Sequence, residues 1–192
     1  MAWDQRPDRR TRRACLHLSY SYAQPYGPAT LVTHDPLRKS GGPKCYQATE
    51  QAVHAAALQL QSRGIAEISE LDAAIAAMKM SGSPAFIVQP SPLTYGHRGS
   101  IISSAQKNGL GTVFAFPAAA REGALVAYGP DYVHMYSRAP FYVDRILKGA
   151  KPADLPVEGP SKLELLVNLQ AAKALGIEVP LALLVRADEL FE

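Results

Sequence analysis

The sequence predicts an α/β fold in which residues 46–192 form a three-layer lobe around a mostly parallel sheet. From Tyr46 to the C-terminus, short apolar runs alternate with helical patterns, and most of the runs lie about ten or more residues apart. Strands separated in this way need helical crossovers, which make neighbouring strands parallel. Hydrophobic residues make up 47% of the 192 residues, enough to bury a sizeable core.

The first half of the lobe is expected to hold two helices and two strands. Ser69 and Asp72 resemble a capping box in front of the second helix, and Gly82 is expected to end it. The second strand, AFIVQ, is a short apolar run between prolines, which is typical of a buried parallel strand. The expected elements are a helix at 47–57, a strand at 58–61, a helix at 71–80 and a strand at 85–89.

The second half continues the alternation. Asp131 and Asn168 stand where helix N-caps are expected, because a short polar side chain can accept from the free N–H groups of the first turn. Pro140 is expected to bend the helix that contains it. The expected elements are a helix at 98–107, a strand at 111–116, a turn or short helix at 117–123, a strand at 124–128, a helix at 132–148, a strand at 162–168 and a helix at 170–175.

Residues 1–45 differ from the rest and are predicted to be a disordered or non-homologous head. They mix arginine, proline, glycine and tyrosine without a sustained period, although LVTH at 31–34 could form an isolated strand. Residues 1–44 carry eight Lys/Arg against three Asp/Glu. A short basic run without interleaved aromatic residues is a weak nucleic-acid signal, so no nucleic-acid partner is expected.

Several function classes find no support in the sequence. No apolar run approaches the roughly 18 residues that a membrane span needs, and none forms a signal-peptide core. Cys15 and Cys45 have no partnering residues at metal-site spacing. The motifs of hydrolases, zinc proteases and nucleotide-binding loops are absent from the sequence. We therefore expect no enzyme activity, no cofactor and no metal.

A ligand site is predicted at one edge of the sheet. The loops 90–97, 117–123 and 129–132 each follow a buried strand, and the carboxyl ends of parallel strands meet at the same edge. Aromatic walls, hydroxyls and carboxylates there suit a small apolar or aromatic solute that carries an ammonium group. The alternatives are that Asp131 only caps a helix, that Tyr128 and Phe116 belong to the core, and that Ser91 and Thr94 are ordinary turn residues. The predicted ligand-binding residues are Ser91, Tyr95, Phe116, Tyr128, Asp131 and Tyr132, with Thr94 and Glu122 beside them.

Four blocks of sequence resemble the C-terminal end of the ABC-transporter substrate-binding protein family related to tryptophan/tyrosine-binding lipoproteins. They are AYGPD at 127–131, YVDRILKGAKPADLPVE at 142–158, LVNLQAAKALG at 166–176 and RADE at 186–189. The resemblance implies a protein similar to type I periplasmic binding proteins. Two Rossmann-like lobes would close on a solute in the periplasm and present it to a membrane ABC permease, without cofactor, metal or covalent chemistry.

The resemblance also implies that this chain is truncated. It leads us to expect a signal peptide, an N-terminal lobe and an apolar first strand before residue 46, where GGPKC stands instead. Without a signal peptide, a cytoplasmic location stays open. Two alternatives are a degenerate fragment without activity and an intracellular ligand-sensing module. The helix at 132–148 would belong to the other lobe, so its apolar side is expected to be exposed and to favour self-association: Val133, Tyr136, Val143, Ile146 and Leu147.

Overall fold

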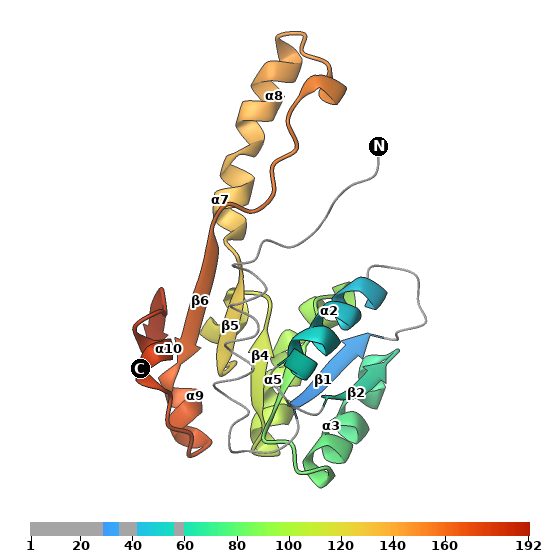
Figure 1. Ribbon diagram of the computed structural model, residues 1–192, viewed down its shortest axis with the longest axis vertical. Helices are drawn as coiled ribbons and strands as arrows, with labels where there is room; N and C mark the ends of the chain where they lie inside the picture. Colours follow the sequence, from blue (N-terminus) through green and yellow to red (C-terminus); the bar gives the residue numbers. More distant parts are fainter. Residues whose placement is uncertain (1–28, 35–41, 56–59) are drawn as a thin grey trace.

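The computed structural model of the chain is an α/β lobe from which one helical arm projects (Figure 1). The structure describes residues 29–34, 42–55 and 60–192, and of residues 29–34 and 42–46 only the backbone is described. This part of the chain holds a seven-stranded sheet in the order β2-β1-β3-β4-β5-β6-β7. The strands are β1 (Ala29–His34), β2 (Leu60–Ile65), β3 (Ala85–Val88), β4 (Gly111–Phe114), β5 (Val126–Pro130), β6 (Leu163–Asn168) and β7 (Glu189–Phe191).

Strand direction confirms the mostly parallel sheet. Strands β1 to β5 run parallel, β6 pairs with β5 in the antiparallel sense, and β7 is parallel to β6. The chain winds from β1 to β2 in one direction and from β3 through β4 to β5 in the other. The boundary between β1 and β3 is therefore the topological switch point, where open α/β sheets offer a crevice at the strand carboxyl ends.

Strand β1 corrects two sequence predictions. It extends the LVTH run to Ala29–His34, and it pairs with both β2 and β3 rather than standing isolated. It also occupies the place in the sheet where the first strand of the lobe was predicted to be missing. Its sequence shows only weak alternation of apolar and polar residues, so the strand is stabilised by pairing with strands that are distant in the chain. The other residues of the predicted head, 1–28 and 35–41, lie outside the described residues.

Most of the helices were predicted, but α4 lies in the predicted loop 90–97, α10 was not predicted, and the start of α3 needs a correction. A 3-10 turn, η1 (Ile68–Glu70), precedes α3 and moves its N-cap to Glu70, which makes no side-chain capping bond, so the predicted capping box is wrong. Asp72 instead accepts from the Ser104 hydroxyl at 2.6 Å and joins α3 to α5. These helices are α2 (Gly42–Ala55), α3 (Leu71–Met80), α4 (Pro92–Gly96), α5 (Arg98–Lys107), α6 (Ala118–Arg121), α9 (Leu169–Ala174) and α10 (Leu181–Leu184).

Two clusters of buried apolar side chains form the core of the described residues. The larger one joins α3, α5 and α6 to one side of β3, β4 and β5 through fully buried residues such as Ile75, Phe86 and Phe114. The smaller one joins β5 and β6 to α9 and α10 and includes Val126 and Val167. Strand alternation explains the division, because successive side chains point to opposite faces.

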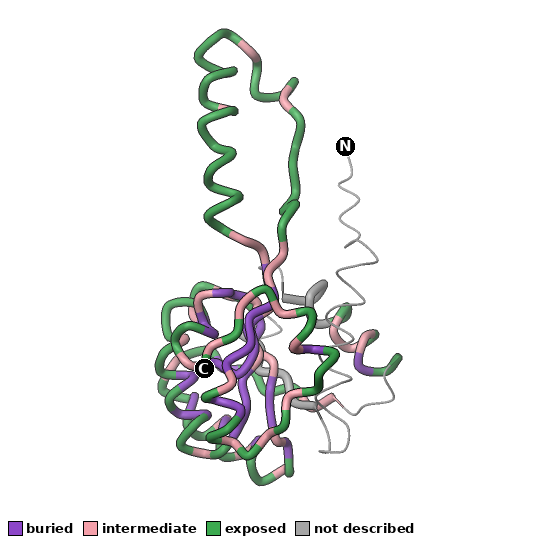
Figure 2. Tube along the Cα trace, turned by 90° about the vertical axis from the view of Figure 1, so that its left-hand side faces the viewer, coloured by how far each residue is buried: buried purple, intermediate pink, exposed green. Residues whose placement is uncertain are grey.

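The arm consists of α7 (Tyr132–Ser137), α8 (Ala139–Leu147), the 3-10 turn η2 (Pro152–Asp154) and the extended return to β6. The predicted bent helix is thus two helices, which meet at Arg138, because Pro140 suits the first turn of a helix but not its interior. Figure 2 shows the arm standing clear of the body with almost every residue exposed. Among the described residues, no helix combines the length and apolar character needed to cross a bilayer.

Candidate functional site

Three aromatic side chains meet at the carboxyl ends of the central strands. The Tyr95 ring packs edge-on against Phe116 with 4.8 Å between ring centroids, and Phe116 lies 6.5 Å from the Tyr132 ring. Tyr95 follows β3, Phe116 follows β4 and Tyr132 follows β5. Phe116 is buried, but Tyr95 is 48% exposed and Tyr132 is 40% exposed. We call these three residues the aromatic cluster; it forms an open apolar surface with two phenol groups.

The turn between β3 and α4 fixes the position of Tyr95. The Ser91 hydroxyl accepts from the Thr94 N–H at 3.1 Å, and the Thr94 hydroxyl accepts from the Ser91 N–H at 2.9 Å, which makes a reciprocal capping box. The Thr94 hydroxyl, fully buried, donates to the Gln89 carbonyl at 2.7 Å. Ser91 and Thr94 therefore act in the turn, which was the alternative to ligand contact.

Arg98 borders the aromatic cluster and neutralises Glu122. Its guanidinium lies 4.8 Å from the Tyr95 ring centroid and donates to the Tyr95 carbonyl at 2.9 Å. The same group donates to Glu122 Oε1 at 2.6 and 2.8 Å. The Glu122 carboxylate is thus already paired, and the planar Arg98 extends the aromatic surface instead.

Tyr132 keeps its proton at neutral pH. Burial raises the pKa of the Tyr132 phenol, and the neighbouring Tyr95 and Tyr136 raise that pKa further. A neutral phenol can both donate and accept a hydrogen bond, so Tyr132 offers a solute a polar contact beside an apolar ring face.

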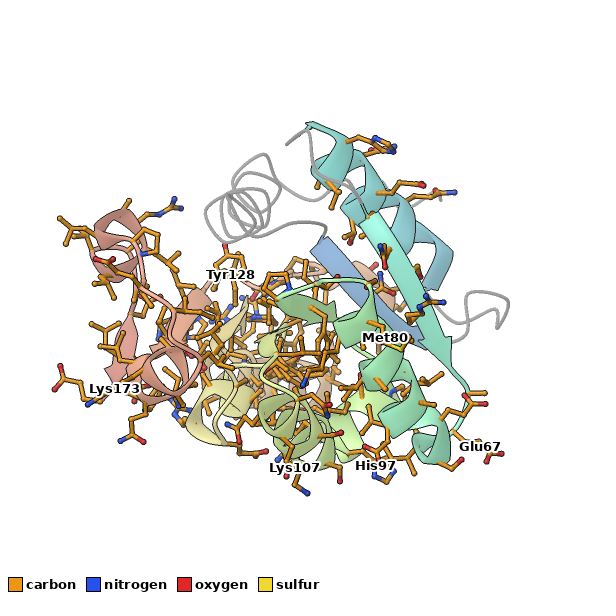
Figure 3. The ribbon with its side chains drawn as sticks, turned by 90° about the horizontal axis from the view of Figure 1, so that it is seen from below. Glu67, Met80, His97, Lys107, Tyr128 and Lys173 are labelled. Atoms are coloured by element: carbon orange, nitrogen blue, oxygen red, sulfur yellow. The ribbon has the colours of Figure 1, made fainter. Side chains whose placement is uncertain are left out.

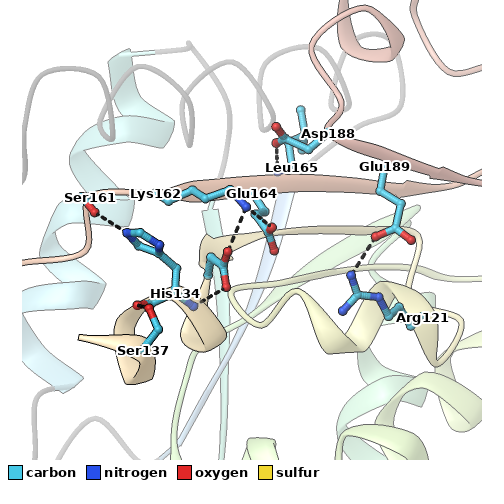
Figure 4. Close-up of polar contacts among 10 residues, drawn as sticks. Arg121, His134, Ser137, Ser161, Lys162, Glu164, Leu165, Asp188 and Glu189 are labelled. Carbon is cyan, nitrogen blue, oxygen red and sulfur yellow. Dashed lines mark hydrogen bonds and ion pairs between the residues drawn. The ribbon is translucent and has the colours of Figure 1, made fainter. Parts of the chain in front are cut away.

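Asp131 holds the root of the arm. One carboxylate oxygen accepts from the His134 N–H at 2.9 Å as the N-cap of α7, and the other pairs with Lys162 Nζ at 2.9 Å. Lys162 also pairs with Glu164 at 2.9 Å, and His134 Nε2 lies 3.1 Å from the Ser161 hydroxyl. Figure 4 shows these contacts at the base of the arm, where the chain leaves the body and where it returns to it.

The charges at this root shift the pKa values of both partners. The His134 N–H bond and then Lys162 hold the pKa of Asp131 below its ordinary value, and Asp131 followed by Glu164 raises the pKa of Lys162. Both oxygens of Asp131 are therefore engaged, as the capping interpretation expected. An ammonium group of a solute would have to compete with Lys162.

Tyr128 lies apart from the aromatic cluster. It packs half-buried against the smaller core cluster, whereas Ala127 before it belongs to the larger one with Phe116. Figure 3 shows Tyr128 on the side of the sheet away from Lys107 of α5. The structure thus brings Tyr95, Phe116 and Tyr132 together and places Tyr128 on the other face.

Sequence reasoning missed Gln89, Arg98 and Lys162. Gln89 directly follows a buried strand, and that position was its only signal. Arg98 and Lys162 carry no motif, and their roles depend on partners 24 and 31 residues away. Within the described ranges, no group of His, Cys, Asp or Glu side chains could hold a metal ion. A cavity of about 420 Å³ lies near the amino ends of β4 and β5, between α5 and α9, with Gln106 and Asn168 in its wall.

The fold has close counterparts among solved structures. A conserved domain protein from Vibrio cholerae matches with a TM-score of 0.81 and 18% identity, over 93% of this chain and 59% of that one. An ABC domain from Streptococcus pneumoniae, in complex with L-Trp, matches with a TM-score of 0.79 and 20% identity, over 94% and 62%. A ligand-free, open substrate binding protein with adhesive properties from Clostridium difficile matches with a TM-score of 0.65 and 18% identity, over 93% of this chain and 59% of that one.

This chain spans about three fifths of the length of these structures. A comparison with curated proteins gives no match. The sequence profile described as ABC transporter substrate binding protein matches residues 43–191, which is most of the chain and includes all four blocks of the resemblance. Because this match covers well over half of the residues, the chain belongs to the family of ABC transporter substrate binding proteins.

Proposed function

We propose that this chain captures a small solute with an aromatic or other apolar group for an ABC transporter. The observation that carries the proposal is the aromatic cluster at the carboxyl ends of β3, β4 and β5. Aromatic faces that stay exposed beside a few polar groups, at this edge of a parallel sheet, are typical of ligand sites. An amino acid with an aromatic side chain fits this chemistry.

The first probe is L-tryptophan, because one structural neighbour is a complex with L-Trp. We expect saturable changes in the NMR spectrum of the labelled chain, with a dissociation constant in the range of roughly 0.1 to 10 mM, since the cluster supplies an open wall rather than an enclosed pocket. Tyr95→Ala and Tyr132→Ala should each weaken this binding.

A matched control is Tyr136→Ala, which removes a 75% exposed tyrosine from α7 outside the aromatic cluster. It should leave the affinity unchanged. The proposal fails if L-tryptophan, L-tyrosine and L-leucine all give no saturable change, or if Tyr136→Ala weakens binding as much as Tyr95→Ala.

Solute capture for transport implies a membrane permease as partner and a location in the periplasm or outside the cell, as is typical of the family. The chain would act by binding and release, without covalent chemistry and without a cofactor. We infer that residues 46–192, together with strand β1 (Ala29–His34) of the same sheet, form the C-terminal portion of such a protein. The chain covers only 59% and 62% of the length of two structural neighbours, which supports a portion rather than a whole protein of this kind.

Two other functions remain as outcomes of experiments. A fragment without activity predicts that no solute binds in the titration above. An intracellular ligand-sensing module predicts salt-dependent binding to DNA that disappears when residues 1–44 are deleted, because phosphate contacts release counterions. We favour solute capture because the exposed aromatic rings belong to the described fold itself.

A further inference from the structure

The side-chain amide of Gln89 is buried without a partner. The residue is only 7% exposed, and its amide nitrogen donates no hydrogen bond within the described part of the chain. Leaving a buried donor unpaired costs free energy, so native proteins rarely keep one without a use. A glutamine here is an unfavourable residue for the ligand-free fold, whereas an apolar side chain of the same length would not be.

The position of Gln89 points to a ligand. It is the first residue after β3, whose neighbour on one side is β1, so it stands at the carboxyl edge of the switch point of the sheet. The orphan amide and the sheet topology are independent observations, and both indicate the same crevice. Strand alternation places Gln89 on the face opposite Phe86 and Val88, which belong to the larger core cluster.

The backbone of Gln89 is also bonded to the turn that carries Tyr95. Its carbonyl accepts from the Thr94 hydroxyl at 2.7 Å, and Thr94 directly precedes Tyr95 in α4. The Gln89 backbone and Tyr95 therefore belong to one turn. A solute that contacts both the ring and the amide must carry a hydrogen-bond acceptor next to its apolar group.

We propose that Gln89 is a specificity-determining residue whose amide donates a hydrogen bond to a carboxylate or carbonyl oxygen of the solute. This inference rests on the proposed function. It assigns selectivity to the acceptor end of the solute rather than to an ammonium group at Asp131, whose oxygens are engaged by His134 and Lys162.

The stability of the ligand-free chain provides the first test. Gln89→Met keeps the length of the side chain and removes the orphan donor, so the melting temperature should rise. Gln106→Met is the matched control, because the Gln106 amide already donates to the Gly123 carbonyl at 3.0 Å. The control should show no rise. A lower melting temperature for Gln89→Met than for the control would show that the Gln89 amide is paired, and would overturn the proposal.

Binding provides the second test, with L-tryptophan and tryptamine, which lacks the carboxylate. Gln89→Met should weaken L-tryptophan about tenfold, as the loss of a hydrogen bond to a charged group implies, and leave tryptamine nearly unchanged. Equal affinity of wild type and Gln89→Met for L-tryptophan, or equal weakening of both probes, would refute the role of Gln89 alone. If wild type binds neither probe and gives no saturable change with L-tyrosine or L-leucine either, the proposed function fails, and the melting temperatures still decide whether the Gln89 amide is unpaired.

Discussion

At the scale of single residues, the block AYGPD gains a steric explanation. A Cβ placed on Gly129 would overlap the backbone carbonyl of Ala115, where the chain leaves β4 and crosses over β5. Only glycine allows this close approach. Phe116 of the aromatic cluster directly follows Ala115, so this close approach lies next to the cluster.

We expect Gly129→Ala to lower the free energy of unfolding by about 1–3 kcal/mol, because the Ala115 backbone has to shift. Gly99→Ala is the control, since a Cβ there meets open space in the exposed first turn of α5. It should be neutral or stabilising by up to about 1 kcal/mol. Urea denaturation of both variants measures the difference, and equal values would contradict the steric argument.

The charge on Asp131 should make stability depend on acid pH. Since its pKa in the folded chain lies below the ordinary 3.8, the ionised carboxylate stabilises the fold above that pH and loses this effect as pH falls through the folded value. Asparagine still caps a helix but carries no charge. Asp131→Asn should therefore melt below wild type at pH 7, and the gap should narrow and close as the pH falls below the ordinary 3.8.

The control for this pH dependence is Asp144→Asn, which breaks the exposed pair with Lys148 on α8. Exposed pairs of this kind contribute little to stability, so its melting curve should follow wild type at every pH. A constant gap between wild type and Asp131→Asn from pH 7 to pH 2 would show that the Asp131 charge has no special role.

At the scale of elements, helix α4 depends on one buried hydroxyl. Thr94→Val keeps the shape of the side chain but leaves the Gln89 carbonyl and the Ser91 N–H without their partner. We expect a loss of about 1–3 kcal/mol in the free energy of unfolding. Ser137→Ala removes an exposed hydroxyl that donates to the His134 carbonyl, and it should change stability by less than about 0.5 kcal/mol.

The elements also show what a sequence can and cannot predict. The caps at Asp131 and Asn168 are confirmed, because capping is a local contact of three residues. Strand β1 was not recognised as part of the sheet, since its pairing with β2 and β3 depends on residues about thirty or more positions away. The side chains of β5 are apolar on both faces of the sheet, because each face packs against one of the two core clusters. The sequence therefore shows no alternation of apolar and polar residues there and could not assign Tyr128 to a face.

At the scale of the whole molecule, the arm presents an apolar surface to solvent. All five residues of the predicted stripe are exposed, with Val133 at 82% and Leu147 at 81%. The predicted exposure of the stripe is therefore confirmed, while the assignment of the helix to another lobe and self-association stay predictions. Several neighbouring apolar side chains without cover favour contact between copies of a chain.

We expect the purified chain to sediment as a mixture of monomers and larger species, in proportions that depend on concentration. The double variant Val133→Ser, Leu147→Ser should shift this mixture to monomers, because it removes the most exposed part of the stripe. Met80→Ser is the control, since Met80 is 88% exposed on α3, away from the arm. A wild-type monomer at all concentrations would exclude the prediction.

The points at which the arm leaves and rejoins the sheet lie close together. The chain departs after Pro130 and returns at Leu163, directly opposite, and the Asp131 N–H still donates to the Lys162 carbonyl at 3.1 Å. The ends of the excursion are thus spaced like those of a tight hairpin, for which a two-residue Asn-Gly turn suffices. Closing a long excursion costs only about 0.6 kcal/mol more for each doubling of its length. Arm and sheet can therefore be exchanged as separate parts, and a chain with residues 131–162 replaced by such a turn should keep the strand order of the body.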